Sequence, residues 1–350
     1  MAQKNTQNQF FDLADPQARR AYFEAKIGPE IKKIQRYFVK GNTFIAYLLG
    51  KKNAGKGTYA KLFSEIFGEN HVGHVSVGDI VRDVHEHART ARGKKELLTI
   101  LKKRYRGFIS IDDTIERLLS RDTKTLLPTE FILALVEHEI SKMPKKALFI
   151  DGFPRGLDQV SYSLYFRDLI GYREDPDFFV IVNVPEAVID ERIKSRMVCP
   201  VCHTPRNLKL MRTKEAGFDP KTKEFYLICD NPSCSGLRER MMAKEGDELG
   251  IEPIRERLEM DQKMIEQAAT LHGIPKVVLN NSVSLKEAAH FDPYELTPEF
   301  VYRYDEAKKT VVIEERPWII KDDKGVASYS LMAPAVLVSM IRQIVDVLGL

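Results

Sequence analysis

Several features that would place a sequence in a specialised class are missing here. No apolar stretch reaches the roughly 18 residues that a membrane-spanning helix needs. Residues 1–10 show no basic segment followed by an apolar one, which a secretory signal would have. Neither sign of charge dominates, because 54 Lys and Arg stand against 50 Asp and Glu and leave a net charge of +4. We therefore expect a cytoplasmic protein with no membrane or nucleic-acid partner.

Cysteine is scarce, and its four copies lie close together in the chain. The spacing is C-x2-C, then 26 residues, then C-x4-C, formed by Cys199, Cys202, Cys229 and Cys234. Two close pairs of thiols are typical of a tetrahedral, structural zinc site in a reducing compartment. The alternatives are unrelated buried or redox-active thiols, and a zinc ligand role for His203, which follows Cys202.

What is present is an ordinary globular composition, with 43% hydrophobic and 30% charged residues. The 350 residues exceed the roughly 100–200 of one typical domain, which indicates either a large domain with insertions or two domains. Short apolar runs separated by helical patterns predict an α/β fold, a doubly wound parallel sheet of five strands. The predicted strands are 43–49, 72–76, 147–150, 178–184 and 276–280.

Two stretches interrupt this alternation and predict inserted subdomains. We expect a core over 42–289, with one helical insert at about 77–130 and one cysteine-bearing insert at about 198–248. A helical extension over 1–41 precedes the core, and a β-meander followed by a helix extends it over 290–350. The final helix, 333–348, is apolar enough either to pack on the core or to form a subunit interface, and we expect a monomer with such a dimer as the alternative.

A glycine-rich loop follows the first predicted strand and opens the first amphipathic helix. Its residues, Gly50 to Thr58, match G-x4-G-K-[ST] with Gly57 inserted between Lys56 and Thr58. In this context backbone N–H groups and the positive end of the helix dipole surround phosphate oxygens, and the lysine reaches the β and γ phosphates. The loop indicates a P-loop NTPase fold.

The chain resembles the nucleoside monophosphate kinases, and adenylate kinases in particular, over about residues 43–285. Besides the Gly57 insertion, three further segments carry the resemblance in the expected order: 76–82 (SVGDIVR), 126–130 (LLPTE) and 151–155 (DGFPR) with Gln159. It continues through Val184-Pro185-Glu186 to Arg192 and Arg196, which we expect on one face of one helix because they are four residues apart. In long-type adenylate kinases the next insertion is a mobile lid, held in some members by zinc. The cysteine cluster begins where such a lid would.

The resemblance implies roles for individual residues. ATP would be held at Asn53, Ala54, Gly55, Lys56, Gly57, Thr58 and Arg192, the last against its base. The monophosphate would be held at Ser76, Val77, Arg82, Leu127, Gly152, Arg155, Gln159 and Arg257. The catalytic cations would be Lys56, Arg155, Arg196, Arg257 and Arg240, with Arg238 and Lys244 as alternatives to Arg240. Asp151 would hold Mg²⁺ through water, supported by Asp79.

Cations dominate this set because the acceptor is already an anion. Moving a γ-phosphoryl group between two nucleotides is mostly positioning and charge neutralisation in a site that excludes water. The expected reaction is ATP and AMP to two ADP, with Mg²⁺ as cofactor and zinc as a structural ion.

Departures from the family pattern leave the acceptor open. Val77 stands where adenylate kinases have a small hydroxyl residue, which favours a UMP/CMP kinase. Gln159 matches the adenylate pattern, and together with the large lid it favours AMP. Lys52-Asn53 replaces the usual Pro-Gly, and because Asn tolerates positive φ we expect the loop to keep its shape.

Two alternative hypotheses assign the chain to other functional classes. The cysteine element could be a zinc ribbon that binds nucleic acid, which would leave the 151–155 segment without a role. The chain could also be an inactive family member that serves as a scaffold, against which the retained Lys56, Arg155, Arg192, Arg196 and Arg257 argue.

Overall fold

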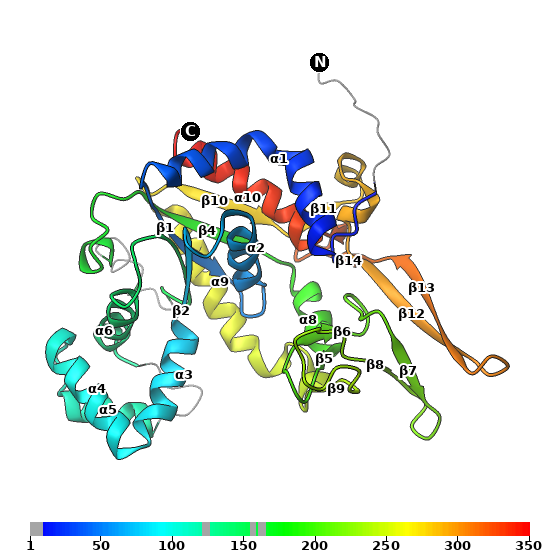
Figure 1. The fold of residues 1–350 in the computed structure, drawn as a ribbon, viewed down its shortest axis with the longest axis horizontal. Helices are drawn as coiled ribbons and strands as arrows, with labels where there is room; N and C mark the ends of the chain where they lie inside the picture. Colours follow the sequence, from blue (N-terminus) through cyan, green and yellow to red (C-terminus); the bar gives the residue numbers. More distant parts are fainter. Residues whose placement is uncertain (1–9, 121–126, 155–158, 160–165) are drawn as a thin grey trace. The chain divides into compact units, whose positions relative to one another are not determined.

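The computed structural model describes residues 10–120, 127–154, 159 and 166–350 (Figure 1). The chain divides into two compact units. The sheet unit comprises Phe23–Val182, Arg257–Leu279 and Leu337–Leu350. The cysteine unit comprises Met1–Tyr22, Asn183–Glu256 and Asn280–Val336. Within the described part of the chain, no helix has both the length and the apolar character to cross a bilayer.

A five-stranded parallel sheet, in the order β10-β4-β1-β3-β2, organises the sheet unit. Its strands are β1 (Ile45–Gly50), β2 (Val72–Ser76), β3 (Ala147–Asp151), β4 (Asp177–Asn183) and β10 (Lys276–Asn280). They confirm the five predicted strands, with ends that differ by one or two residues. Strand β1 pairs with β3 on one side and β4 on the other, so the loop after β1 emerges beside the end of β3, where Leu48 pairs with Asp151.

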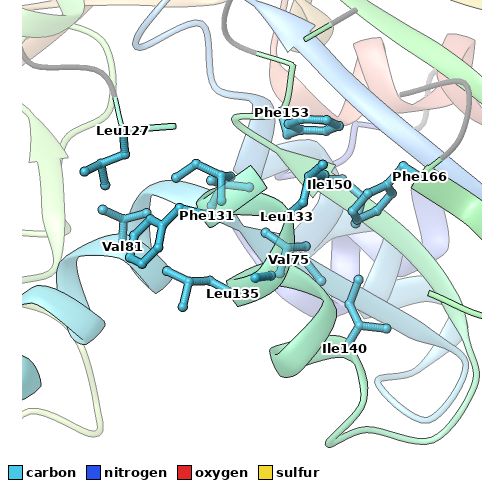
Figure 2. Packing of buried hydrophobic residues seen from close by; sticks show 14 of the residues in the cluster. Val75, Val81, Leu127, Phe131, Leu133, Leu135, Ile140, Ile150, Phe153 and Phe166 are labelled. Atoms are coloured by element: carbon cyan, nitrogen blue, oxygen red, sulfur yellow. The ribbon is translucent and has the colours of Figure 1, made fainter. Parts of the chain in front are cut away.

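Apolar side chains cover both faces of this sheet, which is why its strands read as continuous apolar runs. All six residues of β1 are buried. Ile150 and Val75 face a cluster that includes Val81 and Phe131, and Figure 2 shows these side chains pointing toward one another. On the opposite face the rings of Phe44, Phe63 and Phe149 pack edge to face, with centroids 5.0 to 6.1 Å apart.

The predicted helical insert is a group of helices whose starts are capped by hydroxyl side chains. Ser76, Thr90 and Ser110 accept backbone N–H bonds at the starts of successive helices. Among the described residues, the sheet unit includes α2 (Lys56–Phe67), α3 (Val77–Ala88), α4 (Ala91–Arg104), α5 (Ile111–Leu119) and α6 (Thr129–Ile140). Helices α1 (Pro16–Val39), α9 (Arg255–Thr270) and α10 (Ala333–Val347) each cross from one unit to the other.

The end of the C-terminal helix lies in the sheet unit and packs against β10. This agrees with the first of the two expectations, that the helix packs on the core. Gln343 of α10 accepts from the N–H of Val278 and donates to its carbonyl, at 2.8 and 2.9 Å. These bonds satisfy an edge-strand residue of β10 that would otherwise be open to pairing with another chain.

The cysteine unit contains helix α8 (Glu186–Lys194) and four small sheets (Figure 1). The strands around the cysteines are β5 (Arg196–Val198), β6 (Pro205–Asn207), β7 (Ala216–Asp219), β8 (Glu224–Leu227) and β9 (Met242–Ala243). Those of the C-terminal segment are β11 (Ser282–Ser284), β12 (Pro298–Asp305), β13 (Thr310–Pro317), β14 (Ile319–Lys321) and β15 (Ala327–Ser330).

The predicted C-terminal strands exist, but the single β-meander expected from them is wrong. Strands β12 and β13 form a hairpin of their own, whereas β14 and β15 pair with β11. The break falls at Pro317, which lies opposite Pro298 in the last pair of the hairpin. A proline has no N–H to donate to a neighbouring strand, so the ladder ends there.

Candidate functional site

The glycine-rich loop has the geometry of a phosphate-binding loop. Gly55, at φ 86°, is the N-cap of α2, and among the described residues no side chain caps this helix start. In the part of the chain that the structure describes, no capping side chain therefore competes with an anion at the start of α2. Asn53 has a φ of 64°, which confirms that asparagine keeps the left-handed turn usually given to glycine. Ala54, Gly57 and Thr58 follow on this same loop and first helical turn.

Lys56 lies over this loop and faces the end of β3. Its Nζ donates to the carbonyls of Gly50 and Lys51 at 2.9 and 3.2 Å, and it lies 3.8 Å from a carboxylate oxygen of Asp151. Both side chains are largely shielded, at 15% and 23% exposure. A cation and a carboxylate held side by side next to a ring of backbone N–H groups can bind a phosphate together with its divalent cation.

The residues expected on the monophosphate lie in the sheet unit. Ser76 ends β2 and caps α3, and Val77 is 1% exposed. Arg82 pairs with Asp79 three residues earlier, which is the carboxylate expected to support Mg²⁺. Leu127 and Gln159 are buried, and the Gln159 amide donates to the Thr129 hydroxyl at 3.1 Å.

Two further residues of this group are Gly152 and Arg155, and the surroundings of Arg257 are described below. Gly152 follows β3 with a φ of 86°, a conformation that glycine adopts without strain. Arg155 lies outside the described residues, so its predicted place is not tested.

Arg192 and Arg196 do not share a helix, and this expectation is wrong. Helix α8 ends at Lys194, and Arg196 begins β5. The Ser195 N–H makes the last helical bond, to the Glu191 carbonyl, and the Asn207 amide donates at 3.2 Å to the Arg192 carbonyl, which a further helical turn would have used. Pairing of Arg196 with Asn207 then takes the chain into a strand.

Each arginine of this segment has a defined partner within the cysteine unit. The Arg192 guanidinium donates to the Asn281 amide oxygen at 3.3 Å. Arg196 makes a two-pronged ion pair with Asp247, at 2.6 and 2.5 Å, and Asp247 is 6% exposed. A buried carboxylate that bonds to two nitrogens of a guanidinium group fixes the plane of that group.

The cations considered for the donor phosphate differ in their surroundings. Arg240 pairs with Asp219 at 2.8 Å and lies over the Tyr226 ring, 4.2 Å from its centroid. Arg238 forms a two-pronged pair with Glu215. Lys244 is exposed, and its carbonyl accepts the N–H of Asp247, the partner of Arg196.

The four cysteines converge on one point, as their spacing predicted. All four sulfurs lie within 4.8 Å of one another, and the pairs Cys199–Cys234 and Cys202–Cys229 are each 3.8 Å apart. Zinc–sulfur bonds of about 2.3 Å in a tetrahedron place neighbouring sulfurs roughly 3.8 Å apart, so the set fits this ion. Thr204 hydrogen-bonds to Cys202 and lowers the pKa of that thiol to about 5. His203 is not part of the cluster.

Curated proteins named adenylate kinase are similar to this chain. One from Kosmotoga olearia is 32% identical over 168 residues, which cover 48% of this chain and 66% of the relative. One from Clostridium botulinum is 31% identical over 218 residues, covering 62% of this chain and 80% of the relative. The chain belongs to the adenylate kinase family, whose members are nucleoside monophosphate kinases.

Further comparisons add little to the family assignment. The chain spans slightly less than two thirds of the Kosmotoga olearia adenylate kinase. No family model matches the chain. A solved thymidylate kinase from Ehrlichia chaffeensis is 20% identical, covers 41% of this chain and 75% of its own, and has a TM-score of 0.19, too low to support an argument.

One buried carboxylate that contacts the phosphate loop of this adenylate kinase family member was not predicted from the sequence. Asp261 of α9 is 3% exposed, accepts the N–H of Lys52 at 2.8 Å and pairs with Arg257 at 2.8 Å. It therefore ties the loop to one of the cations expected at the transferring phosphate. The available signal was its place four residues after Arg257 on a predicted helix, where the two side chains share a face.

Proposed function

We propose that this adenylate kinase family member transfers the γ-phosphoryl group of ATP to a nucleoside monophosphate, with AMP favoured, to give ADP and a nucleoside diphosphate. The observation that carries the proposal is the uncapped start of α2, with Lys56 beside Asp151 next to it. This arrangement suits a nucleotide phosphate with magnesium, and the named relatives support the same chemistry.

Residue roles follow the expectations from the sequence. The loop and Lys56 hold the ATP phosphates, and Arg192 lies against the donor base. Arg82 and Arg155 bind the acceptor phosphate, with the Gln159 amide at the acceptor base. When bound, Mg²⁺ would be held by Asp151 through water and would neutralise charge on the phosphates. For the remaining donor-phosphate cation we propose Lys244, because its carbonyl accepts the N–H of Asp247, the partner of Arg196, and we keep Arg240 and Arg238 as alternatives.

Catalysis in this proposal is electrostatic. Four described cations of the set each contact an aspartate: Lys56 with Asp151, Arg82 with Asp79, Arg196 with Asp247 and Arg257 with Asp261. The carboxylates hold the cations in defined orientations before substrate arrives, so little reorganisation is needed as charge develops on the transferring group. Phosphate oxygens would then replace or share these carboxylate contacts.

The cysteine cluster is proposed to hold a structural zinc ion. Four thiolates fill all the ligand positions of a tetrahedral ion and leave none open for substrate. Zinc would therefore stabilise the cysteine-bearing insert without taking part in phosphoryl transfer. Thiolate ligands of this kind persist in a reducing compartment, in keeping with the cytoplasmic location that we propose.

A panel of acceptors tests the proposal. Purified protein with ATP and Mg²⁺ is assayed by coupled ADP detection against AMP, CMP, UMP, GMP and dAMP. We expect turnover to be fastest with AMP. The buried Val77 at the acceptor position keeps a UMP/CMP kinase as the second candidate, and faster turnover with UMP or CMP would establish it. Folded protein that transfers phosphate to none of them would refute the proposal.

Replacing the phosphate-loop lysine gives the first prediction. Lys56→Met should lower kcat at least about 100-fold because it removes the cation nearest the donor phosphates. Circular dichroism should stay unchanged, since the Lys56 side chain is not part of the apolar core. Lys61→Met, an exposed lysine on the same helix, is the matched control and should keep full turnover. Retained activity in Lys56→Met would show that the phosphate site is placed wrongly.

A further inference from the structure

We propose that Asn281 is a positioning residue for the donor nucleotide, acting through Arg192 and held in place by the C-terminal segment. The inference rests on the proposed function, in which Arg192 lies against the base of ATP. Asn281 follows β10 and is 1% exposed, so every polar group on it needs a partner within the protein.

The backbone of Asn281 is tied on both sides. Its N–H donates to the carbonyl of Asn183 at 2.9 Å, and its carbonyl accepts the N–H of Leu331 at 2.8 Å. The first bond fixes Asn281 beside the end of β4, just before α8 begins. The second joins it to the end of β15 in the C-terminal segment.

The side-chain amide of Asn281 is hydrogen-bonded as well. Its Nδ2 donates to the Leu331 carbonyl at 3.0 Å, and its Oδ1 accepts from the Ser330 hydroxyl at 2.9 Å and from the Arg192 guanidinium at 3.3 Å. The opposite orientation of the amide would place its NH₂ group against the guanidinium and its oxygen against a carbonyl. The network therefore selects one orientation, which presents oxygen to Arg192.

This arrangement gives the C-terminal segment a part in the donor site. Ser330 is fully buried, and its carbonyl accepts the N–H of Thr297, at the start of β12, at 2.7 Å. Since Ser330 and Leu331 lie beyond the 43–285 stretch that resembles the kinases, the chain uses added residues to orient a nucleotide-binding arginine. The buried amide supplies no group that touches substrate, so its effect must pass through the guanidinium.

Two variants and a control test the proposal by steady-state kinetics. Asn281→Ala should raise the KM for ATP about three- to tenfold and leave the KM for AMP unchanged, because it removes one hydrogen bond that orients Arg192. Ser330→Ala removes the hydroxyl that holds the amide and that also accepts from the Thr297 hydroxyl at 3.5 Å, and it should raise the ATP KM in the same direction, about two- to threefold. Ser328→Ala, a 2% exposed serine of the same strand whose hydroxyl bonds to the Val326 carbonyl, should change neither constant.

A double-mutant cycle separates positioning from general stability. In an Arg192→Ala background, Asn281→Ala should have no further effect on the ATP KM, whereas a change due to altered folding would persist. An unchanged ATP KM in Ser330→Ala, or equal effects of Asn281→Ala with and without Arg192, would overturn the proposal. If Asn281→Ala does not fold, Ser330→Ala decides the question alone. No effect of Arg192→Ala on ATP would instead refute the proposed role of Arg192.

Discussion

Aspartates contact four of the described cations proposed to bind phosphate, namely Lys56, Arg82, Arg196 and Arg257. The two most buried of these carboxylates, Asp247 and Asp261, are 6% and 3% exposed and each contacts one arginine. A buried carboxylate without a cation would carry a large desolvation cost. Each ion pair therefore fixes the position of the arginine side chain as well as that of the aspartate. At the scale of the residue, the site is organised before it binds anything.

Asp261 offers a direct test of this organisation. Asp261→Asn can still accept the Lys52 N–H but loses the charge that orients Arg257, so we expect kcat to fall about 10- to 100-fold with a small change in stability. Steady-state kinetics and thermal unfolding measure the two effects. Glu259→Gln, an exposed carboxylate on the same helix, is the matched control. Equal kcat values for the two variants would contradict the orienting role.

At the scale of elements, the C-terminal hairpin packs on the cysteine lobe, residues 196–243. The Tyr302 hydroxyl donates to the Leu208 carbonyl at 2.6 Å, and the Phe300 N–H donates to the Lys209 carbonyl at 2.7 Å. The rings of Tyr304 and Phe218 stack with centroids 4.5 Å apart. Figure 1 shows the hairpin β12–β13 beside β7–β8. The lobe is therefore held by a segment about 60 residues further along the chain as well as by its own cysteines.

Tyr302→Phe isolates one of these contacts. Loss of the hydroxyl leaves the buried ring in place but removes its bond to Leu208, which we expect to cost about 1 kcal/mol. Hydrogen exchange of the backbone amides in 205–243 should become faster, because these report local opening of the lobe. Tyr304→Phe, which keeps the ring stacked on Phe218, is the control. Unchanged exchange in Tyr302→Phe would show that the hairpin does not restrain the lobe.

The cysteine lobe should depend on zinc for its stability. Elemental analysis should find about one zinc per chain, and removal by a chelator should lower the Tm by at least about 5 °C, because forming the site is coupled to folding of the lobe. Cys199→Ser should reproduce the loss. His203→Asn, which suits the φ of 56° at that position, should retain the metal. Metal-free protein with an unchanged Tm would refute the zinc site.

At the scale of the whole molecule, buried and half-buried tyrosines predict how stability depends on pH. Burial raises the pKa of Tyr302 and Tyr37 to about 12, and it raises those of Tyr22 and Tyr294 as well. In the unfolded chain these hydroxyls lose their protons near pH 10. The unfolded state therefore releases protons first, so their stabilising contribution is complete below about pH 10 and is lost as the pH rises toward 12.

Urea unfolding across the alkaline range measures this effect. The free energy of unfolding should be insensitive to tyrosine ionisation below about pH 10 and should fall steeply above it. Tyrosinate absorbance should show a group of tyrosines that ionises only as the chain unfolds. Ionisation of all tyrosines in the folded protein near pH 10 would contradict the burial described here.

The sequence by itself determined the features that depend on neighbours along the chain. The strands of the parallel sheet, the phosphate loop with Asn53 in a left-handed turn, and the convergence of the four cysteines were all predicted. Each follows from a local rule, namely continuous apolar runs, a glycine pattern between strand and helix, and ligand spacing. The boundaries of the core at 42–289 and the individual substrate contacts stay predictions.

Only the tertiary structure decided the contacts between distant segments. Asn207 ends α8 before Arg196, Pro317 divides the C-terminal strands into two sheets, and Asp261 and Asn281 orient arginines on other elements or turns. Apart from the i, i+4 spacing of Arg257 and Asp261 and the proline itself, these contacts do not follow from local pattern, because an amide or carboxylate becomes informative only when burial shows which groups must satisfy it. The sequence thus named the cations of the site, and the fold alone revealed what holds them.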